Sequence, residues 1–199
     1  DLALTGKIIE KKDISLESTV NVSFLKNKVL DLGEQETVYV ASNLTGINDG
    51  MYDFIYQVGQ PLGTIYGLNY LGPWKKSEAA EAAKYGMVPG DARYEDLDNN
   101  YVIDASDYKI IGYGMPKVTF GWNTNFAYKG LSVNMFWQGT FGNDKLNYNR
   151  CINMMASRDV TGARFSEIKD RWTEDNQDAF LPAWSPSSKW YPVSNLWLE

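Results

Sequence analysis

The chain has 199 residues, a formal net charge of −6 and an aromatic content of 14%, with 7 Trp, 13 Tyr and 17 Gly. The acidic balance repels phosphate backbones and so argues against nucleic acid as a partner. Because the sequence has no His and a single cysteine, Cys151, it contains no Ser-His-Asp or Cys-His catalytic arrangement, no His-based zinc site and no intrachain disulfide. No apolar run approaches the ~20 residues that a transmembrane helix needs. We therefore expect a protein that is not an enzyme, and the aromatic and glycine content favours β-structure.

Two strands are predicted near the N-terminus. Residues 14–25 alternate between apolar side chains such as Leu16 and Val22 and polar side chains such as Asn21, as in a strand with one apolar face. Residues 2–9 predict a second, less regular strand. Residues 11–13 (KKD) are expected to form the turn between the two.

A long connection over residues 27–115 follows these strands. Connections of this length are uncommon inside compact domains and are usually functional. Within it, residues 77–85 (SEAAEAAKY) predict a helix with Ser77 as its N-cap.

The same connection contains the spacing of a calcium-binding loop. When Asp96 is counted as position 1, oxygen ligands recur along the loop up to position 12, and Ca²⁺ prefers six to eight oxygens. The candidate metal ligands are Asp96, Asp98, Asn100, Val102 through its carbonyl, Asp104 and Asp107. A short helix over residues 105–111 is expected to follow.

Two positions of this loop depart from the calcium-binding pattern. Position 12 is Asp107 instead of a bidentate Glu, and position 6 is Tyr101 instead of Gly, although the sharp turn there favours a positive φ. The alternative is an acidic, Asn-rich turn that caps a helix without metal. If Ca²⁺ binds, its expected role is to order the loop and not to catalyse a reaction.

The clearest strands are predicted over residues 117–128 and 131–141, with Lys129-Gly130 as the turn between them. One face is apolar. The other is built from Asn, Gln, Ser, Thr and Gly, with Phe136 as the exception, and this polar face suits a wet lumen. Each strand has about the ~9–11 residues that cross a bilayer in a tilted barrel. The alternative is an ordinary two-sheet sandwich, whose strands also alternate. The apolar face holds Val118, Phe120, Trp122, Phe126, Val133, Met135 and Trp137.

A second long connection runs over residues 142–189. Residues 161–172 predict a helix, and Pro182, Pro186 and Pro192 indicate irregular structure. Short turns lie on the periplasmic side of outer-membrane barrels and long loops on the extracellular side, so both long connections are expected outside the cell. Four aromatic residues are candidates for contact with a substrate or partner, with packing inside the loop as the alternative. They are Trp172, Trp184, Trp190 and Tyr191.

The succession of short motifs along nearly the whole chain resembles the SusC/RagA-type TonB-dependent receptors. These motifs are residues 27–32 (NKVLDL), 58–63 (VGQPLG), 66–67 (YG), 70–74 (YLGPW), 89–96 (PGDARYED), 110–112 (IIG), 115–117 (MPK), 138–144 (QGTFGND) and 171–173 (RWT). The family's loop commonly has Gly where Asn99 and Tyr101 stand, and this difference weakens the expectation of metal binding.

The resemblance implies an outer-membrane barrel of about 22 strands in a Gram-negative bacterium. It also implies a plug pulled by TonB, a SusD-like lipoprotein over the extracellular loops, and import of glycans or, in some members, peptides. The chain then corresponds to a stretch of the C-terminal half of the barrel, cut from a larger protein and without plug or TonB box. The expected fold is a mainly β, antiparallel transmembrane barrel segment, with short helices and the calcium-type loop in its long extracellular loops. The alternative is a soluble secreted β-domain, ordered by calcium, that binds carbohydrate and buries its apolar face against a second sheet.

Overall fold

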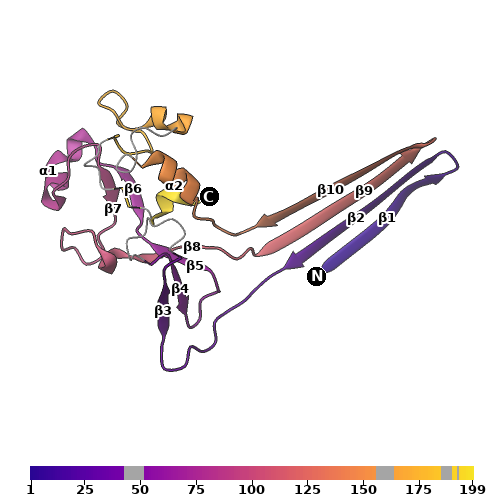
Figure 1. Ribbon diagram of the computed structural model, residues 1–199, viewed down its shortest axis with the longest axis horizontal. Helices are drawn as coiled ribbons and strands as arrows, with labels where there is room; N and C mark the ends of the chain where they lie inside the picture. Colours follow the sequence, from indigo (N-terminus) through magenta and orange to yellow (C-terminus); the bar gives the residue numbers. More distant parts are fainter. Residues whose placement is uncertain (43–51, 156–163, 185–189, 192) are drawn as a thin grey trace.

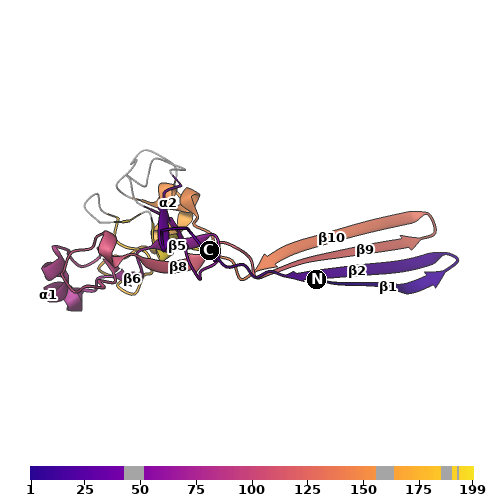
Figure 2. The same cartoon turned by 90° about the horizontal axis from the view of Figure 1, so that it is seen from below.

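The computed structural model describes residues 1–42, 52–155, 164–184, 190–191 and 193–199 (Figure 1). A long four-stranded sheet projects from a body of short strands and helical turns, and two views at right angles show the same separation (Figures 1 and 2). We refer to these two parts as the long sheet and the body.

The long sheet is antiparallel, in the order β1-β2-β9-β10. Its strands are β1 (Leu2–Lys11), β2 (Ile14–Phe24), β9 (Val118–Tyr128) and β10 (Leu131–Phe141). The sequence predicts strands over 2–9, 14–25, 117–128 and 131–141, so the bounds differ by at most two residues. Because β2 pairs with β9, the long sheet joins segments that are separated by the whole connection between them.

Two-residue turns close both hairpins. Lys11 pairs with Ile14, which leaves Lys12 and Asp13 in the first turn. In the second turn, Lys129 and Gly130 have φ values of 49° and 113°. Two successive positive φ values match the right-handed twist of hairpin strands and therefore favour a tight reversal.

The body contains a second antiparallel sheet, in the order β3-β4-β5-β8, and a separate pair of strands, β6 and β7. These six strands are three to five residues long, too short for a convincing alternation in the sequence. They are β3 (Thr37–Val40), β4 (Phe54–Gln57), β5 (Thr64–Gly67), β6 (Tyr70–Pro73), β7 (Ala92–Tyr94) and β8 (Lys109–Tyr113). The described part of the connection over residues 27–115 thus contains regular secondary structure.

The helix predicted over residues 77–85 is present as three continuous turns. They are η1 (Lys76–Glu78), α1 (Ala79–Ala82) and η2 (Ala83–Tyr85). The predicted Ser77 cap is wrong, because the helix begins one residue earlier. The N-cap is Lys75, whose N–H donates to Glu78 Oε2 at 3.0 Å.

The helix predicted over residues 105–111 is also wrong beyond its first turn. Only η3 (Ala105–Asp107) is helical, and β8 begins at Lys109. Ile110 pairs with Tyr66 of β5, so sheet formation overrides the helix, in keeping with the strand preference of β-branched side chains.

Helical turns also occur toward the C-terminus. The sequence does not predict α2 (Tyr148–Met154), which has Asn147 as its N-cap. Of the helix predicted over residues 161–172, the first three residues lie outside the described residues. The rest contains η4 (Ser166–Asp170), and η5 (Asn195–Trp197) follows near the end. Pro186 and Pro192 lie outside the described residues.

The buried core lies entirely in the body. It joins strands β6 and β7 to α2 and to the last residues of the chain. Its buried members are Leu68, Tyr70, Ala92, Tyr94, Tyr108, Cys151, Met154, Met155, Leu181, Trp190, Leu196 and Trp197. The long sheet has no comparable core among the described residues, and this contrast defines the candidate site.

Among the described residues, no helix has both the length and the apolar character to span a membrane.

Candidate functional site

The body leaves the apolar face of the long sheet uncovered. Pairing places Val20, Trp122 and Trp137 in one row across three strands, and Leu16, Phe126 and Val133 in another. Trp122 is 46% exposed and Trp137 is 60% exposed. Exposed apolar faces of this extent mark contact with a membrane or another protein.

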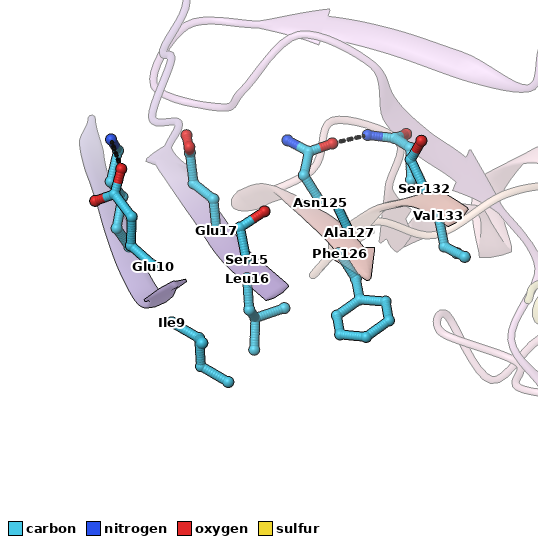
Figure 3. A pocket seen from close by; sticks show the side chains of 12 residues that line it. Ile9, Glu10, Ser15, Leu16, Glu17, Asn125, Phe126, Ala127, Ser132 and Val133 are labelled. Carbon is cyan, nitrogen blue, oxygen red and sulfur yellow. Dashed lines mark hydrogen bonds and ion pairs between the residues drawn. The ribbon is translucent and has the colours of Figure 1, made fainter. Parts of the chain in front are cut away.

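The two faces of the long sheet differ sharply in chemistry. Figure 3 shows Leu16, Phe126 and Val133 pointing to one side, and Glu17 and Asn125 to the other. The direction alternates because successive side chains of a strand point to opposite faces. The sheet therefore separates an apolar environment from a polar one.

A ladder of amides runs along the polar face of the long sheet. The Asn134 side-chain amide donates to Asn123 Oδ1 at 3.0 Å and also to Asn125 Oδ1. The Asn21 side chain covers the neighbouring Gly121 closely, because a Cβ added to Gly121 would lie 2.6 Å from Asn21 Oδ1. These paired amides give the second face of the long sheet the polar character that its sequence predicts.

One polar row interrupts the apolar face, and its groups are paired. Trp122 Nε1 donates a 2.7 Å hydrogen bond to Ser18 Oγ, and Ser18 and Thr124 hydroxyls lie 3.3 Å apart. Ser18 breaks the sequence alternation of residues 14–25. The pairing shows how this break is tolerated, since a polar group on an apolar face needs a hydrogen-bond partner.

The acidic loop before β8 brings three of its predicted ligands together. Oxygens of Asp96, Asp98 and Asp107 all lie within 4.8 Å of one another. Asp107 is fully buried, and its two oxygens accept from the N–H groups of Leu97 at 2.7 Å and Asp104 at 2.9 Å. Three carboxylates at this spacing form a donor set that suits a hard divalent cation.

Of the other predicted ligands, Asp104 does not belong to this carboxylate cluster, whereas the Asn100 side-chain amide donates to Asp98 Oδ2 at 2.8 Å. Asp104 Oδ1 accepts from the N–H and hydroxyl of Ser106, and so caps η3. Asn100 Oδ1 accepts from the N–H of Val102 at 2.7 Å. The loop therefore combines the capping turn and the carboxylate cluster, which the sequence suggests as alternatives.

The backbone of the loop makes the sharp turn that a calcium loop has at position 6, although the residue there is Tyr101 and not Gly. Asn99 has a φ of 59° and Tyr101 a φ of 64°. Tyr101 adopts the positive φ for which Gly is usual, and its N–H donates to Asp96 Oδ2 at 2.9 Å. Burial opposes ionisation of Asp96. Hydrogen bonds from the backbone N–H groups of Tyr101, Asn99 and Asn100 outweigh this effect of burial. They hold the pKa of the Asp96 carboxyl below its usual value.

The four aromatic candidates do not share one surface. Trp172 and Trp190 are buried. The Tyr191 hydroxyl donates to the Ile103 carbonyl at 3.3 Å. The Arg164 guanidinium carbon lies over the Trp184 ring, 4.9 Å from the centroid of that ring. Packing thus accounts for most of this aromatic content.

The curated proteins that the chain is similar to are TonB-dependent receptors. No protein-family profile matches it. The TonB-dependent receptor P26 of Formosa agariphila is 29% identical over 185 residues, which cover 92% of this chain and 18% of that receptor. The TonB-dependent receptor P3 of the same bacterium is 28% identical over the same shares of the two chains.

A solved structure has the same fold. A chain in the structure of the RagAB peptide transporter matches 99% of this chain with a TM-score of 0.74 and 19% identity, over 20% of its own length. The chain spans about a fifth of the length of the curated relatives that it matches. The chain is therefore similar in sequence to one segment of TonB-dependent receptors and shares the fold of one segment of the RagAB transporter, a resemblance that its sequence motifs predict.

Proposed function

We propose that the chain forms part of the wall and the extracellular loops of an outer-membrane β-barrel transporter in a Gram-negative bacterium. In this proposal, the complete receptor imports glycans or peptides, is driven by TonB, and works with a SusD-like surface lipoprotein. The observation that carries the proposal is the exposed apolar face of the long sheet, backed by a polar face of amides and hydroxyls.

The dimensions of this face suit a bilayer. From Ile14 to Phe24 there are ten steps along β2. At about 3.3 Å per step the strand is about 33 Å long, and a tilt of about 40° reduces its height to about 25 Å. This height equals the apolar band of outer-membrane barrels.

The positions of the two turns and of the body give the proposed orientation of the long sheet in the membrane. Both two-residue turns lie at one end of the long sheet, and the body lies at the other (Figure 1). Barrels of this class have short periplasmic turns and long extracellular loops. We therefore place the body outside the cell, where a lipoprotein partner would meet it.

The free edges of the long sheet support a larger barrel. Each of β1 and β10 has one side that pairs with no other strand in the part of the chain that the structure describes. An unpaired edge is not viable in hydrocarbon, so neighbouring strands of the complete receptor would pair there.

A soluble domain that binds carbohydrate is the second candidate function. It requires the apolar face to be covered by a second sheet. The body's short sheet lies beyond the end of the long sheet and does not stack on it (Figure 2). Trp137 and Phe141 stay more than half exposed, which disfavours this candidate.

We also propose that the acidic loop binds Ca²⁺. Asp96, Asp98 and Asp107 would hold the cation, which would neutralise three clustered carboxylates and fix the loop against the body. Hard oxygen donors at this spacing support the assignment, and the role is structural.

Fractionation of the native membrane tests the main proposal. We expect the polypeptide that carries this sequence to be extracted from the outer membrane with detergent, to show the heat-dependent gel mobility of a barrel, and to co-purify with a lipoprotein. A soluble polypeptide of the same sequence would contradict it.

A further inference from the structure

An open hollow of about 540 Å³ lies on the polar face of the long sheet. Its volume is within the range of about 300–1,000 Å³ that is usual for small-ligand sites. Most of the described residues that line it have polar-face positions in the strand register. These are Asn21 of β2, Thr119 and Gly121 of β9, and Phe136, Gln138 and Thr140 of β10. We call this site the polar-face hollow.

A glycine forms the floor of the polar-face hollow. The register places Asn21, Gly121 and Gln138 side by side in one row across three strands. Because Gly121 has no side chain, the row falls to the level of the backbone between the two amides. Asn21 Oδ1 leans over this floor, 2.6 Å from the place that a Cβ of Gly121 would take. The floor therefore has an amide on each side.

Phe136 adds an aromatic ring to this polar surface. It lies two positions before Gln138 along β10, so the two side chains point to the same face. The Phe136 ring is 61% exposed, and it belongs to none of the ring pairs among the described residues. The ring thus offers a flat apolar surface to a ligand, next to groups that can form hydrogen bonds.

The amides and threonine hydroxyls of the hollow form no hydrogen bond with any other described residue. Farther along the same face, by contrast, the Asn134 amide donates to Asn123 and Asn125. No Lys, Arg, Asp or Glu is among the described residues that line the hollow. Amides and hydroxyls both donate and accept, so this lining suits an uncharged ligand that is rich in hydroxyl groups.

The hollow lies near the body end of the long sheet. Phe24 pairs with Val118 at that end, and Thr119 is the next residue of β9 (Figure 1). In the proposed orientation the body is outside the cell and the polar face lines the lumen. The hollow then lies at the extracellular mouth of the lumen, where a substrate enters.

We propose that the polar-face hollow binds one sugar ring of an uncharged oligosaccharide. The inference rests on the proposed function and deepens it, because it favours glycans over peptides as the substrate. The C–H groups on one face of the sugar ring pack on the Phe136 ring, whose π-system is negative at its face. Asn21 and Gln138 exchange hydrogen bonds with the sugar hydroxyls. A short peptide has charged termini, for which the hollow offers no opposite charge.

Calorimetric titration of the intact receptor in detergent tests this binding. The probes are uncharged hexasaccharides of glucose, mannose, galactose and xylose, with hexaalanine as the peptide. We expect binding of at least one hexasaccharide, and Phe136→Ala should weaken it about tenfold, the effect of losing a favourable ring contact. Phe136→Trp retains a ring and should stay within about threefold of the unsubstituted receptor. Gln138→Ala should weaken binding about threefold, the effect of losing one hydrogen bond.

Phe141→Ala is the matched control. Its ring is 65% exposed near the same end of β10, but it lies on the apolar face. We therefore expect this variant to bind the hexasaccharide as the unsubstituted receptor does. Heat-dependent gel mobility checks that each variant is folded, and Gln138→Ala replaces Phe136→Ala if the latter is not.

Several results would overturn the proposal. They are binding of hexaalanine alone, binding of no hexasaccharide, and equal effects of Phe136→Ala and Phe141→Ala. A less stable Phe136→Ala receptor with unchanged sugar binding would also overturn it, because the ring would then pack against another part of the receptor. A receptor absent from the outer membrane would refute the proposed function, whereas a receptor that lies there and binds no sugar would refute this inference alone.

Discussion

The backbone N–H of Lys129 donates a 2.9 Å hydrogen bond to the carbonyl of Asp13. This bond joins the turns of two hairpins that are more than a hundred residues apart in sequence. It places both tight turns at one end of the long sheet, and the body lies at the other end (Figure 1). The sheet therefore has the asymmetry of an outer-membrane barrel wall, from which the following predictions derive.

A charge on the apolar face should be far more harmful than one on the polar face. Met135 lies near the middle of the apolar face, and Asn134 is its neighbour on the polar face. We expect Met135→Arg to lower the free energy of unfolding of the intact receptor by about 2–4 kcal/mol, as for Arg at the bilayer midplane. Denaturant unfolding in vesicles measures this change. Asn134→Arg is the matched control, and equal losses in the two variants would contradict a lipid-facing side.

Removal of the Ser18 hydroxyl should leave the Trp122 indole N–H without its partner. Since Ser18 Oγ accepts a 2.7 Å hydrogen bond from Trp122 Nε1, we expect Ser18→Ala to cost about 1–3 kcal/mol in lipid. Ser23→Ala, on the polar face, serves as the control and should be nearly neutral. Unfolding in vesicles compares the two, and an unchanged stability for Ser18→Ala would mean that Trp122 finds another partner.

Calcium binding should depend on Asp98 and not on Asp104. Asp98 is exposed and belongs to the carboxylate cluster, whereas Asp104 caps η3. We expect Asp98→Asn to weaken Ca²⁺ binding about tenfold or more, because one of three charged ligands is lost. Asp104→Asn should leave the affinity within about threefold, which is about 0.7 kcal/mol. Calorimetric titration of the chelator-treated receptor measures both, and equal effects of the two substitutions would contradict the assigned cluster.

The body should lose stability in alkali. Burial raises the pKa of Tyr108 to about 12 and raises the pKa of Tyr70 further. Because only the neutral tyrosine is tolerated in the core, its burial contributes fully to the stability of the fold below the unfolded-state pKa of about 10. This contribution is lost as the pH rises toward the higher pKa of the folded state. Protease resistance of the body, followed from pH 9 to pH 12, should therefore fall above about pH 10. In Tyr70→Phe, the loss of protease resistance above about pH 10 should be smaller. The same pH dependence in this variant and in the unsubstituted protein would contradict a role for Tyr70 ionisation.

The long sheet was predictable from the sequence because its strands have about ten residues of nearly unbroken alternation. Ten positions make a period of two visible, and Lys129-Gly130 marks the turn. The short strands of the body gave no such signal. Their formation depends on contacts between distant segments, such as Ile65 with Gly112, which local patterns do not reveal.

The candidate site was only partly predictable. The spacing of acidic residues located the loop, but Asp104 has its oxygen bonded to Ser106 and Asn100 has its oxygen bonded to Val102. These local hydrogen bonds compete with metal ligation, and spacing alone does not distinguish the two.

Depth-resolved spin labelling of the long sheet in the reconstituted receptor tests the central claim most directly. Single cysteines are introduced along β10 at positions such as Val133→Cys, Asn134→Cys and Met135→Cys, in a background with Cys151→Ser. A lipid-facing side predicts alternating access, with Val133 and Met135 labels relaxed by oxygen in hydrocarbon and the Asn134 label relaxed by a water-soluble nickel complex. Uniform access to the aqueous reagent along β10 would contradict the assignment of this sheet to a barrel wall.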